Sequence, residues 1–161
     1  MPLHDPVPDP VRGPVNVRPV TQQDLPLVLE IADASPEAAQ WSFVGYQSLL
    51  KSGALCWVAG YEKRVLGFLL ARQAADELEI LNLAVSAASR RKGVGSLLLR
   101  EALAWAEQNG ISKLHLEVRA SNFAAVKLYE AHGFRSAGGR RGYYSNPPDD
   151  ALLLCFAVAG K

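Results

Sequence analysis

The chain has 161 residues, of which 49% are hydrophobic and 20% are charged, and its formal net charge is +1. This length and composition are typical of one soluble globular domain. Near neutrality excludes a protein-wide basic field for nucleic acid and an acidic field for cationic partners, so any anion site must be local. Two local basic clusters stand out, Arg90-Arg91-Lys92 and Arg140-Arg141.

The amino-terminal segment differs in composition from the rest, because residues 1–14 hold five of the ten prolines. We expect a disordered tail there and a single folded domain over residues 15–161. The tail lacks the apolar segment of a signal peptide, and the longest uncharged apolar stretch, residues 151–160, is too short to span a bilayer. Cys56 and Cys155 lie in apolar runs, where we expect small buried side chains; one disulfide stays open as an alternative. These features predict a cytoplasmic protein without a metal site or membrane contact.

The first half of the chain alternates between the two-residue period of strands and the longer period of helices. Pro19 places the first strand at a sheet edge or ends it, because proline cannot donate to a strand ladder. Thr21 and the residues after it are suited to start one helix, and a second short helix follows Ser42. The predicted strands are residues 15–20, 54–61, 65–73 and 77–85, the middle two forming a hairpin.

The second half begins with a strand–helix–strand unit. After the strand at residues 77–85, a basic loop leads through Gly93-Val94-Gly95 into a long helix, and residues 113–119 form an alternating strand. Such a unit requires parallel strands and a right-handed crossover. The remaining predicted elements are a helix at residues 123–132, strands near 134–140 and 151–158, and a loop between those two strands.

A strand, a basic loop, Gly-x-Gly and a helix follow one another in an order suited to binding phosphate. Glycines let the backbone approach an anion closely, and the free amides and dipole of a helix start favour negative charge. Two familiar phosphate motifs do not fit. Gly95 is not followed by the Lys-Ser/Thr of a Walker loop, and Leu98 stands where a dinucleotide fingerprint has its third glycine. The alternative is a solvated basic loop with a plain turn.

The run Arg90-Arg91-Lys92-Gly93-Val94-Gly95 resembles the Gln/Arg-x-x-Gly-x-Gly/Ala pyrophosphate motif of the GNAT superfamily of acetyl-CoA-dependent N-acetyltransferases. The resemblance covers residues 15–158 and implies acetyl-CoA as cosubstrate and no metal. It implies an α/β (α+β) fold in which a mixed sheet of about seven strands contains a splayed parallel pair and is flanked by about four helices. The coenzyme-binding residues it implies, the first three through their backbone, are Leu83, Ala84, Val85, Arg90, Arg91, Lys92, Gly93, Val94, Gly95, Ser96 and Asn122.

Three further runs resemble the RimI type of this superfamily: Leu116-Glu117-Val118-Arg119-Ala120-Ser121-Asn122, Leu128-Tyr129-Glu130 and Arg141-Gly142-Tyr143-Tyr144. That type acetylates the N-terminal alanine of a ribosomal small-subunit protein, so the resemblance implies a protein N-terminus as acceptor. We expect a monomer or weak homodimer that makes no direct contact with nucleic acid.

Two departures from the RimI pattern fall on the acceptor side. Gln40 precedes Trp41 where that type has proline, and Gly142 replaces an asparagine. Acetylation of a protein lysine or of a small amine therefore stays an alternative. A non-catalytic acetyl-CoA sensor is another, although it would be expected to lack the catalytic residues.

Acetyl transfer to an amine requires a base for the amine's proton, a donor for the thioester carbonyl and an acid for the leaving thiolate. Glu117 is the candidate base, because it points away from the apolar face of its strand near the carboxyl end, where ligands of α/β sheets bind. A solvated charge or a partner for Arg119 is the alternative. The resemblance implies Tyr129 as the acid, although a core tyrosine is the commoner role. The acceptor-side candidates are Trp41, Glu79, Arg141, Tyr143 and Tyr144.

Overall fold

The computed structural model describes residues 14–35 and 41–160, so the predicted tail, apart from Pro14, and Gln40 lie outside the described residues. The described strands are β1 (Asn16–Pro19), β2 (Leu55–Tyr61), β3 (Arg64–Ala74), β4 (Glu77–Val85), β5 (Lys113–Arg119), β6 (Arg135–Ser145) and β7 (Pro148–Ala157). The described helices are α1 (Leu25–Asp33), α2 (Phe43–Lys51), α3 (Val94–Gln108) and α4 (Phe123–Ala131), with 3-10 turns η1 (Gln22–Asp24) and η2 (Ala87–Ser89). Among these helices, none has the length and apolarity that crossing a bilayer requires.

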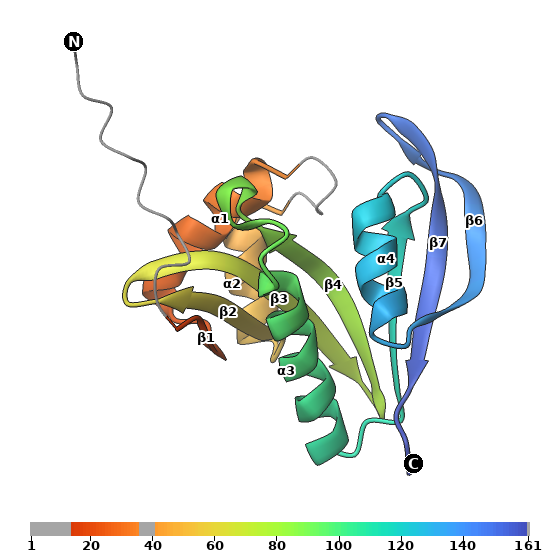
Figure 1. The fold of residues 1–161 in the computed structure, drawn as a ribbon, viewed down its shortest axis with the longest axis horizontal. Helices are drawn as coiled ribbons and strands as arrows, with labels where there is room; N and C mark the ends of the chain where they lie inside the picture. The colour runs from red at the N-terminus through yellow and green to blue at the C-terminus, as the bar shows by residue number, and fades with distance from the viewer. Residues whose placement is uncertain (1–13, 36–40, 161) are drawn as a thin grey trace.

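The strands form one seven-stranded mixed sheet in the order β1-β2-β3-β4-β5-β7-β6 (Figure 1). Only β4 and β5 run parallel among the described strand pairs, and α3 connects them as the sequence predicts. β1, which contains Pro19, occupies one edge of the sheet, as expected for a strand with a missing donor. The predicted fold, with about seven strands, a parallel pair and about four helices, is confirmed.

Helices cover both faces of the sheet, and each face has its own apolar core. The core under α3 and α4 includes Leu98, Leu99 and Ala102 of α3 packed on Leu69 and Leu114 of the sheet. The core under α1 and α2 is built from a separate set of buried residues: Leu25, Val28, Ile31, Tyr46, Val58, Phe68 and Leu70. The period-two alternation of the central strands divides their side chains between these two cores.

Strand β4 changes the face to which its buried side chains point. Leu78, Ile80, Asn82 and Ala84 are all buried, but the first two belong to the α3 core and Ala84 belongs to the α1–α2 core. The register with β3 shifts opposite Leu81, where one extra residue interrupts the pairing. A β-bulge of this kind re-aims the residues that follow it, and it turns Asn82 toward Tyr46 of α2.

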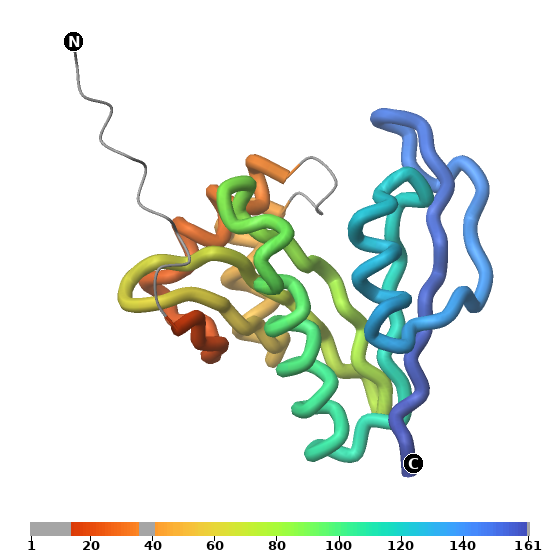
Figure 2. Tube along the Cα trace, viewed as in Figure 1, coloured from red at the N-terminus to blue at the C-terminus, as the bar shows by residue number. Residues whose placement is uncertain are grey.

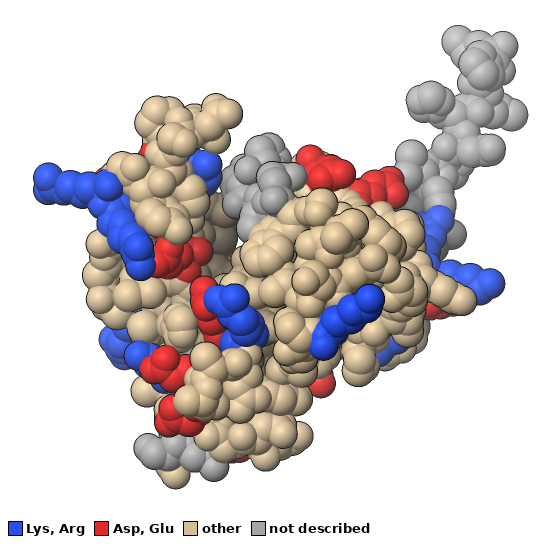
Figure 3. Space-filling view, turned by 180° about the vertical axis from the view of Figure 1, so that it is seen from behind, with Lys and Arg blue, Asp and Glu red and all other residues tan. Residues whose placement is uncertain are grey.

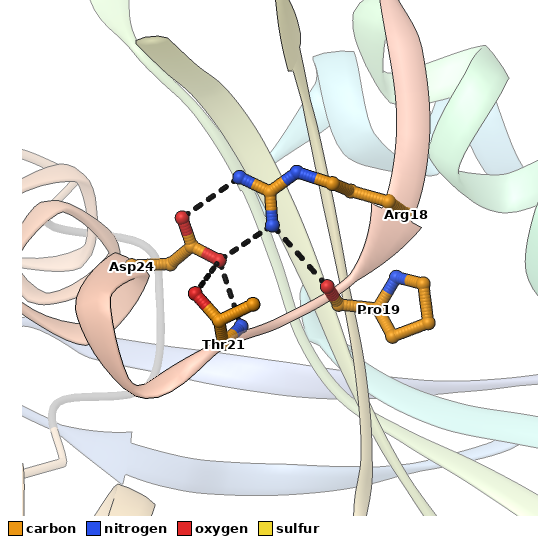
Figure 4. Close-up of polar contacts among 4 residues, drawn as sticks. All are labelled: Arg18, Pro19, Thr21 and Asp24. Carbon is orange, nitrogen blue, oxygen red and sulfur yellow. Dashed lines mark hydrogen bonds and ion pairs between the residues drawn. The ribbon is translucent and has the colours of Figure 1, made fainter. Parts of the chain in front are cut away.

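The edge strand β1 is tied to the first helix by a closed ionic contact (Figure 4). The Arg18 guanidinium donates to both oxygens of Asp24, at 2.6 and 2.8 Å. The backbone and hydroxyl of Thr21 donate to Asp24 Oδ2 at 2.7 and 2.9 Å. The Arg18 hydrogen bonds are the main reason that the pKa of Asp24 falls to about 2. This carboxylate therefore stabilises the corner between β1 and η1.

The prediction of a long loop between the last two strands is wrong. β6 continues to Ser145 and β7 begins at Pro148, so residues 141–150 form the end of a hairpin around a turn at Asn146-Pro147. The register shifts between Arg140 and Tyr144, and Gly142 absorbs the bulge with a φ of 60°. Glycines and prolines usually mark loops, which is why the pattern misled. Both cysteines are free, and Cys155 is half-buried where a buried side chain was expected.

Candidate active site

Strands β4 and β5 form a wedge because they pair over only three positions. The pairs are Glu77 with Lys113, Leu78 with Leu114 and Glu79 with His115, after which the strands diverge. β3 follows β4 as far as Val85, and β7 follows β5 through Arg119, so each diverging strand keeps its outer neighbour. Figures 1 and 2 both show the two traces separating. A cavity of about 610 Å³ lies between them. The splayed parallel pair is thus confirmed.

The inner edge of β4 presents free backbone groups to this cavity. Ser86 N donates to Leu66 O of β3 at 2.8 Å, so the backbone of Ser86 faces β3. Val85 O instead accepts from Arg90 Nε at 3.3 Å and faces away from β3. Because strand groups alternate, the amides of Leu83 and Val85 point into the wedge, and the backbone of Ala84 points to β3. All three residues line the cavity, as predicted.

The turn before α3 leaves helix amides without partners. Arg91 and Gly93 both have positive φ, at 62° and 83°, and the first backbone bond of α3 runs from Leu97 N to Gly93 O. Within the described ranges, the amides of Val94, Gly95 and Ser96 have no acceptor. A Cβ on Gly95 would lie 3.0 Å from Leu128 Cδ2 of α4, so glycine lets the two helices approach without displacing that side chain. Three free amides at a helix start are suited to a diphosphate.

The basic side chains of the loop have different surroundings. Arg90 donates to Val85 O and to Ser35 Oγ, each at 3.3 Å, and it lines the cavity. Arg91 and Lys92 are exposed. The Ser96 hydroxyl shares a hydrogen bond of 3.1 Å with His132 Nε2. Ser96 therefore offers its amide, rather than its hydroxyl, to an anion at the helix start.

Glu117 lies on β5 with its side chain opposite the apolar face, at the cavity wall. Arg140 Nε of β6 lies 3.1 Å from Glu117 Oε1. Arg119 is not its partner, because that guanidinium donates to Asn146 O and Pro147 O at 3.2 and 2.9 Å and lies 4.1 Å from the Tyr144 ring centroid. Sequence reasoning missed the contact between Glu117 and Arg140. The only sign of it was the basic pair Arg140-Arg141.

Tyr129 of α4 lines the same cavity and is only 5% exposed. Its ring packs against Phe134 with 5.4 Å between centroids, and burial raises the pKa of its phenol. No group in the described residues hydrogen bonds with its hydroxyl, which leaves the proton available to a ligand. Asn122, also at the cavity, caps α4 by accepting from Ala125 N at 3.3 Å. Asn122 therefore serves as the N-cap of α4.

The acceptor-side candidates fall into two groups. Glu79, Tyr143 and Tyr144 line the cavity, whereas Trp41 and Arg141 are not among its lining residues. Glu79 is paired with Arg72 at 2.9 Å. The β6–β7 hairpin that carries the two tyrosines reaches the open end of the wedge (Figure 1). The wall thus combines an acidic side chain with aromatic rings.

A buried polar pair in the cavity wall was not predicted. Asn82 Nδ2 donates to the Tyr46 hydroxyl at 3.2 Å, and burial raises the pKa of Tyr46 to about 12. The pair links the bulge of β4 to α2, so it supports the wall from behind. Its partners are 36 residues apart in sequence, and no local pattern could have joined them.

Charge on the molecular surface is mixed. On the face shown in Figure 3, basic and acidic side chains are interspersed among uncharged ones, in keeping with the net charge of +1. Across residues 14–35 and 41–160, no group of three or more His, Cys, Asp or Glu side chains is arranged to hold a metal ion. An anion would therefore meet local features of the site, chiefly the start of α3.

Residues 23–134 match the acetyltransferase (GNAT) family. The chain therefore belongs to this family, and it is an acetyl-CoA-dependent N-acetyltransferase. This agrees with the resemblance noted in the sequence, with the splayed strands and with the free amides at the start of α3.

The chain is similar in sequence and structure to individual members of this family. It is 32% identical over 138 residues to the [ribosomal protein bS18]-alanine N-acetyltransferase of Escherichia coli K12, which covers 84% of this chain and 93% of that protein. The crystal structure of the ribosomal-protein-S18-alanine N-acetyltransferase from Escherichia coli matches with a TM-score of 0.82 at 29% identity, covering 92% of this chain and 96% of that one. Arabidopsis thaliana NAA60 in complex with acetyl-CoA shares the fold, with a TM-score of 0.79 at 20% identity over 91% of this chain and 100% of that one.

Proposed function

We propose that this protein moves the acetyl group of acetyl-CoA to the N-terminal α-amine of a protein, an alanine of a ribosomal small-subunit protein. The observation that carries the proposal is that Glu117 and Tyr129 line one cavity between the splayed strands, and that Gly95 at the start of α3 lies close to Val85 of the cavity wall. Similarity over 84% of the chain to an enzyme named for alanine acetylation supports this acceptor.

The residues at the cavity fit the coenzyme in two places. The amides of Val94, Gly95 and Ser96 would hold its diphosphate, and the amides of Leu83 and Val85 would face its acetyl carbonyl and amide-bearing arm. When bound, the coenzyme supplies a thioester carbonyl as electrophile and a thiolate as leaving group. Both sets of amides belong to rigid elements, so they are arranged before the ligand arrives.

Proton transfers are assigned to the two side chains in the cavity. Glu117 takes a proton from the acceptor ammonium, directly or through a water, which leaves the nitrogen lone pair free to attack the carbonyl carbon. As the new C–N bond forms and the C–S bond breaks, the Tyr129 hydroxyl donates its proton to the departing sulfur, and the second proton lost by the nitrogen restores the phenol through solvent. The raised pKa of Tyr129 means that this phenol is protonated at neutral pH and able to donate.

The hairpin accommodates one departure from the RimI pattern. Gly142 has a φ of 60°, and asparagine is among the residues that adopt this conformation most readily. Glycine in place of asparagine is therefore compatible with one backbone bend before Tyr143 and Tyr144. This supports a peptide acceptor over a small amine. The second departure, at Gln40, lies outside the described residues.

A peptide panel tests the proposal. The protein is incubated with acetyl-CoA and an alanine-initiated peptide that also contains an internal lysine, and products are mapped by mass spectrometry. The matched control is the same peptide with its α-amine already acetylated, and free lysine and a polyamine complete the panel. We expect one acetyl group on the alanine α-amine and no product from the blocked peptide. Product on lysine or on small amines alone would overturn the α-amine assignment, and coenzyme binding without any product would favour a sensor.

A further inference from the structure

The contact between Arg140 and Glu117 gives the proposed base a neighbour with a defined geometry. The shortest distance of this ion pair is 3.1 Å, between Arg140 Nε and Glu117 Oε1. Among the described residues, no hydrogen bond to Glu117 Oε2 is formed. Glu117 is 28% exposed and Arg140 64% exposed. One carboxylate oxygen is thus held from β6 while the other is left for a ligand.

The bulge of β6 explains how Arg140 reaches Glu117 across the intervening strand β7. Arg140 pairs with Ala151 immediately before the register shifts. The Gly142 amide then donates to Asp150 Oδ1 at 2.8 Å, which fixes the bulge. Gly139 approaches so closely that a Cβ there would lie 2.7 Å from Ala151 O. Glycine at this position therefore allows β6 to approach β7 closely beside Arg140.

The Arg140 side chain is held from its other side by an aromatic ring. Its guanidinium carbon lies 5.3 Å from the ring centroid of Tyr143, a distance at which a cation is attracted to the ring face. Tyr143 lines the cavity and Arg140 does not. Arg140 therefore lies between Tyr143 and Glu117, and only Tyr143 and Glu117 line the cavity.

Other charged groups around Glu117 are engaged elsewhere. On β5, Arg119 donates to two hairpin carbonyls, and His115 lies 3.8 Å from Glu77. Across the wedge, Glu79 is paired with Arg72. Tyr144 is close enough that the Glu117 charge, together with burial, raises its pKa. Arg140 is thus the cation in direct contact with Glu117 among the described residues.

We propose that Arg140 is a positioning residue, which holds Oε1 of Glu117 so that Oε2 faces the acceptor amine. This inference rests on the proposed function, because it assigns Arg140 a role only through the base. A carboxylate fixed by one oxygen loses rotamer freedom without losing its second acceptor.

The test compares Arg140→Gln, Arg140→Lys and the double variant Arg140→Gln with Glu117→Gln. Arg135→Gln, another exposed arginine of β6, is the matched control. Steady-state kinetics use the best acceptor of the peptide panel, and thermal melting verifies that each variant folds. We expect Arg140→Gln to lower kcat about tenfold with KM for the acceptor within about twofold of the parent value. Arg140→Lys should recover part of the loss, and Arg135→Gln should match the parent.

Two readouts separate positioning from a merely structural role. The loss in Arg140→Gln should appear in kcat and not in KM for the acceptor, since the orientation of the base affects the reaction step rather than acceptor binding. In the Glu117→Gln background, Arg140→Gln should have no further effect, because the group it positions is already absent. An equal loss in both backgrounds, or a rise in KM at constant kcat, would overturn the inference while leaving Glu117 as the base. Parent-like turnover in Glu117→Gln would overturn both assignments.

Discussion

Two arginine–carboxylate pairs lie on opposite edges of the sheet, and they differ in how completely the carboxylate is engaged. Arg18 of β1 donates to both oxygens of Asp24, and Thr21 adds two more hydrogen bonds. The shortest distance between Arg140 of β6 and Glu117 is 3.1 Å, between Nε and Oε1. The Asp24 side chain is 8% exposed and that of Glu117 is 28% exposed.

The difference separates a stabilising carboxylate from one that is available for chemistry. A carboxylate with all its acceptor sites filled contributes through charge-assisted hydrogen bonds and has nothing left for a ligand. A carboxylate held at one oxygen beside a cavity contributes less to stability, because an exposed pair is screened by solvent, but its second oxygen stays available. The Asp24 pair should therefore influence folding alone, and the Glu117 pair should influence turnover alone.

The largest expected effect is on turnover, when the Glu117 carboxylate that pairs with Arg140 is replaced by an amide. Glu117→Gln should lower kcat by roughly 10² to 10⁴-fold, the usual contribution of a general base. Tyr129→Phe should lower kcat as well, because the acid for the leaving sulfur is lost while the ring still packs on Phe134. Rapid-quench or steady-state kinetics with the alanine peptide measure both losses.

Binding and stability serve as the controls for these two variants. The dissociation constant of coenzyme A, measured by calorimetry, should stay within about twofold of the parent value, because neither side chain belongs to the free amides of α3. The free energy of unfolding should change by about 0.5 kcal/mol or less for Glu117→Gln, since its pair is largely exposed. A Glu117→Gln variant with parent kcat, or one that unfolds readily, would remove the distinction between the two pairs.

The next largest expected effect is on stability, when the ion pair between Arg18 and Asp24 is broken. Asp24→Asn should cost about 2 kcal/mol, because hydrogen bonds to a charged, nearly buried group are lost, and this figure already allows for screening at Arg18, whose side chain is 41% exposed. Urea denaturation measures the change. Asp33→Asn, at the exposed end of α1, is the matched control and should remain within about 0.5 kcal/mol of the parent. The kcat of folded Asp24→Asn should equal that of the parent.

The pH dependence of stability sharpens the same prediction. The pKa of Asp24 is about 2 in the folded protein and 3.8 in its ordinary state, so the unfolded chain binds the proton more tightly. Its contribution is therefore complete above about pH 4 and is lost as the pH falls toward about 2. Unfolding free energies at pH 7, 4 and 3 should show the gap between parent and Asp24→Asn narrowing below pH 4. A constant gap would mean that the charge of Asp24 is not what stabilises the corner.

Much of the fold could be predicted, because regular alternation of apolar and polar residues identifies a strand from the sequence alone. β4 and β5 have the predicted bounds, and their parallel pairing follows from the helix between them. The two strands of the β6–β7 hairpin were predicted, but their extension over residues 141–150 could not be, because that part contains glycine and prolines that ordinarily end a strand. Only the pairing with β7 compensates for their weak local preference.

Some features of the candidate site could likewise be predicted from local sequence patterns, whereas others depend on the register of strands far apart in the sequence. Alternation alone placed Glu117 opposite the apolar face of β5, and the Gly-x-Gly turn marked the free amides of α3. The partner of Glu117 lies 23 residues further along, at Arg140, between two register shifts of β6 against β7, one after Ser136 and one after Arg140. Arg18 and Asp24 likewise meet only because a strand ends and a 3-10 turn begins between them.

The smallest expected effect comes from removing the Thr21 hydroxyl, which donates a hydrogen bond to Asp24. Thr21→Ala removes the 2.9 Å hydrogen bond to Asp24 Oδ2 but keeps the backbone amide that donates to the same oxygen at 2.7 Å. The cost should be about 1 kcal/mol by urea denaturation, and Thr21→Ser, which keeps the hydroxyl, should recover most of it. The cost should also shrink in the Asp24→Asn background, because the hydroxyl then loses its charged acceptor. If Thr21→Ala cost as much as Asp24→Asn, the stability of the corner would depend on Thr21 rather than on Arg18. A carboxylate engaged by several donors would then no longer explain why this pair differs from the pair at Glu117.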